Sequence, residues 1–310
     1  MPTALITGIL GQDGSYLREL LGARGYRVVG LDQVAPPAPL PGIEVVVGDV
    51  SDADAIARAF AVATPDEVYH LAGQTSVGRS FAEPAMTFRS LALSTLHVLE
   101  AARAAPKRPK VLVAGSGEVF GDTGGEPASE STPFRPVSPY GSAKAAVAHL
   151  TATYRSSFGL FACVAHFYNH ESPRRPPHFV TQKIVRAACR IAQGAAERLT
   201  LGDTSVVRDF GWAPEYVEAA TRMLAADAPR DFVIASGESV SLDAFVERVF
   251  AALGLRAAEH VTHEQALMRA AEIPVMRANP SAAAASLGWR AEVRLDDLIG
   301  RLIEAASAPS

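Results

Sequence analysis

Tyr140 and Lys144 have the residue types and the spacing that most directly suggest catalysis in this sequence. They form a YxxxK pattern near the start of a predicted helix, where an i, i+4 pair lies on one face. A lysine ammonium beside a phenol favours the phenolate, so we expect Lys144 to lower the pKa of Tyr140 and make it a usable base. Ser116, which follows a predicted strand, is the third candidate catalytic residue. The alternative for Tyr140 and Lys144 is that a YxxxK pattern occurs in this helix by chance.

Gly8, Gly11 and Gly14 form a GxxGxxG turn between a predicted strand and a predicted helix. Such a turn lets the backbone approach a pyrophosphate held at the helix N-terminus, although glycine turns also serve as plain connections. Asp32 ends the second predicted strand, where a carboxylate can bind ribose hydroxyls and repel a 2′-phosphate, which favours NAD over NADP. Asp49, after the third strand, is either an adenine contact or a turn residue.

Apolar runs alternate with amphipathic stretches through the first half of the chain, which is typical of a parallel sheet covered on both faces. The pattern predicts strands near residues 4, 27, 43, 67, 110 and 161, and helices over 15–23, 53–63, 85–104 and 138–158. Pro139 fits the first turn of the last helix, where a missing N–H does least harm. The predicted fold is a doubly wound parallel α/β sheet (Rossmann) with a smaller α/β substrate-binding lobe.

The predicted domain boundaries follow from where this regular alternation ends. Residues 1–168 form the dinucleotide-binding domain, to which 206–235 return, and residues 169–205 and 236–310 form the substrate-binding lobe.

Composition excludes several classes of protein. Of the 310 residues, 48% are hydrophobic, which is enough for a large core. The net charge is −4 and there is no basic run, so we expect no nucleic-acid partner. No membrane span is expected, and with no secretory signal at the N-terminus we expect a cytoplasmic protein. The two cysteines, Cys163 and Cys189, lack metal or disulfide spacing, so we expect core thiols and no metal site.

Several longer segments resemble one enzyme family. The glycine turn with Ser116, Tyr140 and Lys144 is similar to the extended short-chain dehydrogenase/reductases. Within them the chain resembles the GDP-mannose 4,6-dehydratases over most of its length, through ALITGILGQDGSYL, GSGEVFG, TPFRPVSPYGSAK, FYNHESPRRPPHFVTQKI, RDFGWAPEYVEA and DFVIASGE. The resemblance adds cofactor-binding residues to those above, namely Gln12, Asp13, Val50, Leu71 and Ala72, with Tyr140 and Lys144 also contacting the cofactor.

The resemblance implies a reaction cycle for the catalytic group. Tyr140, assisted by Lys144 and Ser116, would take the proton of the sugar C4 hydroxyl while hydride passes to NAD. Glu118 would then remove the C5 proton and help expel water from C6, and the hydride would return to C6. A strand-end glutamate facing solvent is the alternative for Glu118, because environment sets such roles.

The same resemblance implies a site for the sugar nucleotide. Asn169 would contact its diphosphate, Arg208 a phosphate, Lys183 the base and Glu272 the ribose, with Arg269 in the same stretch as Glu272. An arginine suits phosphate because it is always charged and can bond two oxygens. Surface ion pairs are the alternative for these charged residues. For Arg174 and Arg175 the sequence leaves two alternatives, contacts to phosphate or solvated surface charges. His170 and His178 are expected to be structural.

Three departures from the family qualify this prediction. Gly117 stands where the family usually has a serine, and related 4-keto-sugar reductases resemble this chain in having a glycine there. Asp32 and Gln33 replace arginines that bind a 2′-phosphate, which favours NAD. The connection that follows is much shorter than in the family, where this region helps to build a tetramer. We therefore expect a homodimer, formed through the helices near 85–104 and 138–158.

We therefore expect 4,6-dehydration of a GDP-hexose, with an NAD(P)H-dependent 4-keto-sugar reductase or epimerase as the alternative and a non-catalytic NAD-binding regulator as a further one. A shortened region near 254–265 leaves the sugar open between GDP-mannose and a relative such as a GDP-heptose.

Overall fold

The computed structural model describes residues 1–265 and 271–308. The central sheet of this described chain has seven strands, all parallel, in the order β10-β6-β5-β4-β1-β2-β3. Its strands are β1 (Thr3–Thr7), β2 (Arg27–Asp32), β3 (Glu44–Val47), β4 (Glu67–His70), β5 (Lys110–Ala114), β6 (Ala162–Phe167) and β10 (Phe232–Ile234). The order reverses direction next to β1, which is the doubly wound arrangement. The predicted fold class is confirmed.

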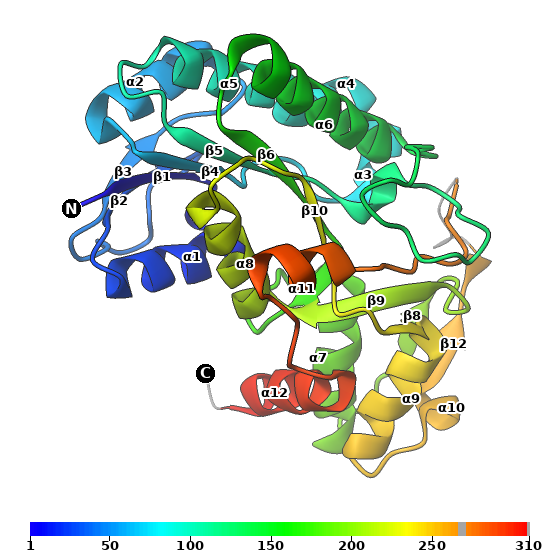
Figure 1. The fold of residues 1–310 in the computed structure, drawn as a ribbon. Helices are drawn as coiled ribbons and strands as arrows, with labels where there is room; N and C mark the ends of the chain where they lie inside the picture. Colours follow the sequence, from blue (N-terminus) through cyan, green and yellow to red (C-terminus); the bar gives the residue numbers. More distant parts are fainter. Residues whose placement is uncertain (266–270, 309–310) are drawn as a thin grey trace.

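Helices cover both faces of this sheet (Figure 1). One face carries α1 (Gln12–Ala23), α8 (Ala213–Ala225) and α11 (Ser281–Leu287), and the other carries α2 (Ala53–Ala63), α5 (Ser94–Ala104) and α6 (Pro139–Phe158). Each face has its own buried apolar cluster, one built around Leu17, Leu112 and Met223 and the other around Ile56, Leu99 and Val147. The inner strands β1, β5 and β6 are nearly continuous apolar runs because both sides of the sheet are buried there.

The predicted helix over 85–104 is interrupted in the structure. It divides into α4 (Pro84–Phe88), a π-helical turn (Arg89–Leu93) and α5, after the short α3 (Val77–Ala82). The hydroxyls of Ser94 and Thr95 both donate to the carbonyl of Leu91, at 3.1 and 2.7 Å. Such side-chain donors compete with the helical ladder and accompany the wider turn.

A second layer of elements lies at the carboxyl ends of the strands (Figure 1). It contains a three-stranded sheet of β7 (Asn169–Glu171), β9 (Val207–Trp212) and β11 (Ser239–Ser241), and a pair of β8 (Leu199–Leu201) with β12 (Val261–His263). Its helices are α7 (Val180–Ala192), α9 (Leu242–Ala252), α10 (Ala257–His260) and α12 (Leu295–Ser307). A separate apolar cluster that includes Ile184, Phe245 and Leu298 holds these elements together.

Candidate active site

Glycines shape the turn that joins β1 to α1. Gly8 has a φ of +73°, and a Cβ on Gly14 would lie 2.2 Å from the carbonyl oxygen of Gly8. The Gly11 N–H donates to that same oxygen at 3.0 Å. Only residues without side chains permit this close approach, which leaves the first turn of α1 open toward a ligand.

This turn forms one wall of a cleft of about 620 Å³, whose lining includes all three glycines, Gln12, Asp13, Asp32, Val50, Leu71 and Ala72. Asp32 accepts hydrogen bonds from the Leu10 N–H at 3.0 Å and the Gln33 N–H at 2.8 Å. Asp49 accepts from the Ser51 N–H at 2.7 Å and so caps the loop after β3. A glycine cradle with a carboxylate at the end of β2 fits a dinucleotide with free ribose hydroxyls.

The start of α6 is fixed by local sequence. The Ser138 hydroxyl accepts from the Gly141 N–H at 3.0 Å, Pro139 occupies the first turn, and Gly159 ends the helix in the left-handed region. Tyr140 and Lys144 are consequently held on one buried face of α6, against the carboxyl end of β5. Lys144 Nζ donates to the Ala114 carbonyl at 2.6 Å and lies 5.9 Å from the centre of the Tyr140 ring.

Ser116 and Glu118 reach the same place from the end of β5. The Ser116 hydroxyl accepts from the Glu118 N–H at 3.2 Å, and Ser116 also forms a side-chain hydrogen bond with Tyr140. Glu118 is half-buried. The structure thus brings the four predicted catalytic residues to one edge of the sheet.

The pKa of Tyr140 differs from the sequence-based expectation. Burial raises it to about 12, while the hydrogen bond from Ser116 acts in the opposite direction and Glu118 adds to the rise. Burial also lowers the pKa of Lys144 to about 8. Burial therefore dominates both pKa values, because a low-dielectric environment disfavours either charged form. Activation of Tyr140 by Lys144 stays a prediction.

Gly117 has a steric explanation. A Cβ at this position would lie 2.7 Å from Cε2 and 2.8 Å from Cζ of Tyr168, far inside normal contact. Tyr168 follows β6 and is 4% exposed, and its hydroxyl donates to the Arg277 carbonyl at 3.1 Å. The ring therefore takes the space that a serine side chain at 117 would need.

The predicted substrate residues lie on the second layer. Asn169 begins β7, and Arg208 in β9 is buried and paired with Glu272 at 2.5 Å. Lys183 in α7 donates to the Thr200 carbonyl at 2.6 Å. Arg269 lies outside the described residues. Arg208 and Glu272 come together, as their predicted roles in one nucleotide site require, but they do not form the surface ion pair of the alternative, because the Arg208 side chain is only 7% exposed.

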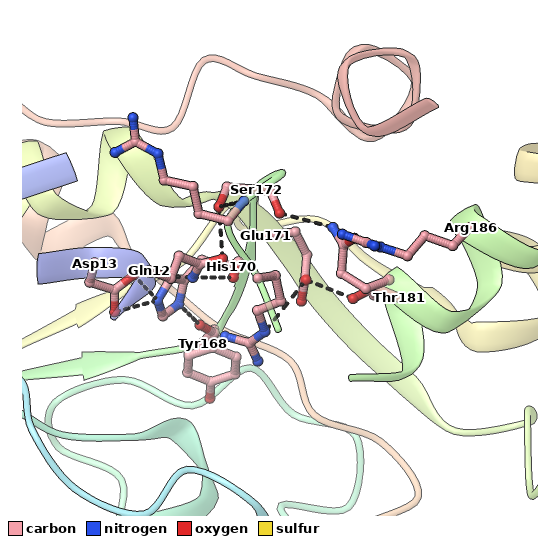
Figure 2. Close-up of polar contacts among 11 residues, drawn as sticks. Gln12, Asp13, Tyr168, His170, Glu171, Ser172, Thr181 and Arg186 are labelled. Atoms are coloured by element: carbon pink, nitrogen blue, oxygen red, sulfur yellow. Dashed lines mark hydrogen bonds and ion pairs between the residues drawn. The ribbon is translucent and has the colours of Figure 1, made fainter. Parts of the chain in front are cut away.

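A polar network joins the glycine turn to the segment after β6 (Figure 2). His170 Nε2 lies 3.0 and 3.1 Å from the carboxylate oxygens of Asp13, and Gln12 Nε2 donates to the His170 carbonyl at 3.1 Å. Ser172 donates to Gln12 Oε1 at 2.9 Å. The sequence predicted only a structural role for His170, because no metal-ligand pattern surrounds it. No local pattern could indicate Asp13 as its partner, which lies 157 positions away.

Two features are absent from the described residues. Within 1–265 and 271–308, no group of three histidine, cysteine or acidic side chains is placed to hold a metal ion. No helix in these ranges is long and apolar enough to cross a membrane.

The fold and the site define a Rossmann-type protein of the extended short-chain dehydrogenase/reductase class. Among solved structures, "MoeE5 in complex with UDP-glucuronic acid and NAD" has a TM-score of 0.86 at 26% identity and covers 98% of each chain.

Sequence comparison identifies the family within this class. Residues 5–302 match the family model described as GDP-mannose 4,6 dehydratase. GDP-mannose 4,6 dehydratase 2 of Arabidopsis thaliana is 39% identical over 97% of this chain and 86% of its own length. The GDP-mannose 4,6-dehydratase of Vibrio cholerae is 35% identical over 97% and 92%. The chain belongs to the GDP-mannose 4,6-dehydratase family, which confirms the resemblance.

Proposed function

We propose that this protein is an NAD-dependent sugar-nucleotide dehydratase that converts GDP-mannose, or a close relative such as a GDP-heptose, to its 4-keto-6-deoxy form. The observation that carries the proposal is the placement of Glu118 beside Ser116, Tyr140 and Lys144 at the end of β5. A carboxylate two residues beyond the serine supplies the additional acid–base group that elimination of water requires. Family membership supports the same reaction.

Each catalytic residue has a defined proposed task. Tyr140, hydrogen-bonded to Ser116, takes the proton of the C4 hydroxyl, and Lys144 holds positive charge near the phenol at neutral pH, below its pKa of about 8. NAD held beside these residues would supply the hydride chemistry at C4 and C6, and the proton that Tyr140 takes from the C4 hydroxyl would go to C5, so that the net change is the loss of one water. Glu118 removes the C5 proton, which the C4 ketone acidifies, and protonates the departing C6 hydroxyl.

The cofactor and substrate would occupy adjacent parts of the molecule. The glycine turn and Gln12, Asp13, Val50, Leu71 and Ala72 would hold the cofactor, and Asp32 would bind the adenosine ribose. Asp49 would contact adenine. Asn169, Arg208, Lys183, Arg269 and Glu272 would hold the GDP group. We propose that residues 1–168 with 206–235 form the cofactor-binding domain and that 169–205 with 236–310 form the sugar-nucleotide lobe, with Arg208 of β9 contributed to the nucleotide site from the first of these parts.

We also propose a homodimer, formed through the surface of α4 to α6. Phe88, Leu93 and Phe158 lie on this surface with exposed fractions of 40%, 37% and 43%. Exposed large apolar side chains on neighbouring helices are common in subunit contacts. The cytoplasmic location stays a prediction.

The test is mass spectrometry of the nucleotide sugar after incubation of the protein with NAD and, separately, GDP-mannose and a GDP-heptose. We expect a product lighter by one water from wild type, and a rate about 100- to 10,000-fold lower from Glu118→Gln. The variant should still bind NAD and GDP. Full activity in Glu118→Gln would exclude the proposed role of Glu118.

Gly117 favours a second candidate, a 4-keto-sugar reductase. This enzyme would leave GDP-mannose unchanged and would add two hydrogens to a GDP-4-keto-6-deoxy sugar when NADH is supplied. The same mass measurement therefore separates the two reactions.

A further inference from the structure

β7 brings two binding features next to each other. Asn169, the proposed diphosphate contact, and His170, the partner of Asp13, are successive residues of this strand. Successive residues of a strand point to opposite sides. β7 therefore presents one side chain toward the proposed substrate site and the next toward the turn that shapes the cofactor cleft.

The hydrogen bonds of His170 define its protonation. Nδ1 lies 2.7 Å from the Tyr168 carbonyl, which can only accept, so this nitrogen carries a proton. Nε2 lies 3.0 Å from one carboxylate oxygen of Asp13 and 3.1 Å from the other, and an ionised carboxylate also only accepts. Both ring nitrogens therefore donate, and His170 with Asp13 forms a buried imidazolium–carboxylate pair.

The surroundings of this pair are consistent with the charged form. The His170 ring stacks on Tyr216 of α8 at 4.8 Å and lies 5.3 Å from Phe167, while Arg175 is the other nearby cation. Burial acts to lower the pKa of His170, but the charge and hydrogen bonds of Asp13 outweigh it, and the net shift is upward. Burial likewise acts to raise the pKa of Asp13, and His170 reverses this to a net lowering.

Neighbouring contacts extend the pair into a connection between elements (Figure 2). Gln12 bonds the His170 carbonyl and Ser172, and Gln182 of α7 donates to the Ser172 carbonyl at 2.9 Å. The first turn of α1, β7 and the start of α7 are thus connected by side-chain hydrogen bonds. A displacement of β7 would shift the glycine turn through these bonds.

We propose that His170 is a positioning residue that couples the two binding sites, so that the dinucleotide and the GDP group each bind more tightly when the other is present. The proposal rests on the proposed function for the identity of the two ligands. The ion pair with Asp13 holds the cofactor turn in the position set by β7, and Asn169 fixes the position of β7 when a diphosphate is bound. Coupling of this kind is reciprocal between the two ligands.

The test is a fluorescence titration with NADH, in the absence and presence of saturating GDP, which occupies the proposed nucleotide site without turnover. In wild type we expect GDP to tighten NADH binding by about 5- to 150-fold, the usual range of such coupling. In His170→Phe, which keeps an aromatic ring against Tyr216 but removes both N–H donors, GDP should leave the NADH dissociation constant nearly unchanged. A merely structural role would alter the NADH affinity or the melting temperature, but not the ratio of the NADH dissociation constants without and with GDP.

The controls address folding and specificity. His170→Phe leaves the Asp13 carboxylate without its imidazolium, so Asp13→Asn/His170→Phe, which removes both charges, serves if the single variant does not fold. In the double variant, as in His170→Phe, GDP should leave the NADH dissociation constant nearly unchanged. His149→Asn, at an exposed histidine of α6, should retain the full effect of GDP.

Retention of the wild-type ratio in His170→Phe or the double variant would overturn the proposal, as would a wild type on which GDP has no effect. Dehydration of GDP-mannose is measured separately by mass spectrometry. Dehydration without coupling overturns only the present proposal, whereas coupling without dehydration overturns only the proposed reaction.

Discussion

Adding one methyl group at Gly117 tests the packing that holds the catalytic serine and glutamate. The Cβ of Gly117→Ala would lie 2.7, 2.8 and 3.0 Å from three ring carbons of Tyr168. The ring is 4% exposed and tied by its hydroxyl to the Arg277 carbonyl, so it has little room to move. The backbone of Gly117 does not lie in the left-handed region, so alanine meets no backbone strain. The cost is therefore overpacking, about 1–3 kcal/mol of unfolding free energy.

A double-mutant cycle isolates this contact. Tyr168→Phe keeps the ring carbons, so Gly117→Ala should cost the same in its background. Tyr168→Ala removes the ring and itself costs about 3–5 kcal/mol as a large core truncation. In that background the added methyl should cost close to nothing, which gives a coupling energy of about 1–3 kcal/mol between positions 117 and 168.

The assay is urea unfolding of six proteins, wild type and the five variants, followed by measurement of kcat for those that fold. Because Gly117 stands between Ser116 and Glu118, a shift of about 1 Å there should lower kcat by about 100-fold. An equal cost of Gly117→Ala in all three backgrounds, or no cost at all, would show that the ring does not determine which residue position 117 accepts.

Two further predictions concern the cofactor and the buried lysine. Asp32→Ser removes a carboxylate that is placed to accept hydrogen bonds from ribose hydroxyls. The dissociation constant of NAD should therefore rise by about 10- to 100-fold, and the preference for NAD over NADP should become smaller. Calorimetric titration with both cofactors measures this, and an unchanged preference for NAD would contradict the role assigned to Asp32. Burial lowers the pKa of Lys144 to about 8 from an ordinary 10.5, so the unfolded chain binds this proton more tightly and stability should rise with pH between those values. Lys144→Met should consequently be more stable than wild type at pH 7, by up to about 3 kcal/mol of unfolding free energy. Urea unfolding should show this difference becoming smaller toward pH 10.5. A difference that does not depend on pH would refute the argument from burial.

Local sequence was sufficient for the elements that place the cofactor turn and α6. Gly8 and Gly14 occupy positions where only hydrogen fits, and Ser138 and Pro139 mark the beginning of α6 within one residue of the prediction. These signals are local because a turn or a helix cap depends on residues within a few positions of one another. The central sheet followed from the same alternation of strands and helices.

Contacts between distant segments could not be predicted in this way. The pairs Asp13–His170 and Gly117–Tyr168 join residues whose proximity depends on how β5, β6 and α1 meet in space. Periodicity determines which face of an element is buried, but it does not determine which residue of another element that face meets. The pKa of Tyr140 was likewise unpredictable, since the desolvation that raises it depends on the packing of the whole site.

The structure changes what Gly117 implies about the reaction. As a sequence feature, glycine in place of serine suggested a reductase, because it removes a hydroxyl beside the proposed leaving group. In the structure the Tyr168 ring accounts for the glycine through packing alone, whatever the reaction. Gly117 consequently gives less support to the reductase than the sequence suggested, and Glu118, which lies beside Ser116 and contributes to the raised pKa of Tyr140, carries the distinction between the two reactions. A dehydratase with this packing needs Glu118 as its acid–base group, and a reductase does not, so the response of each reaction to Glu118→Gln separates them where position 117 cannot.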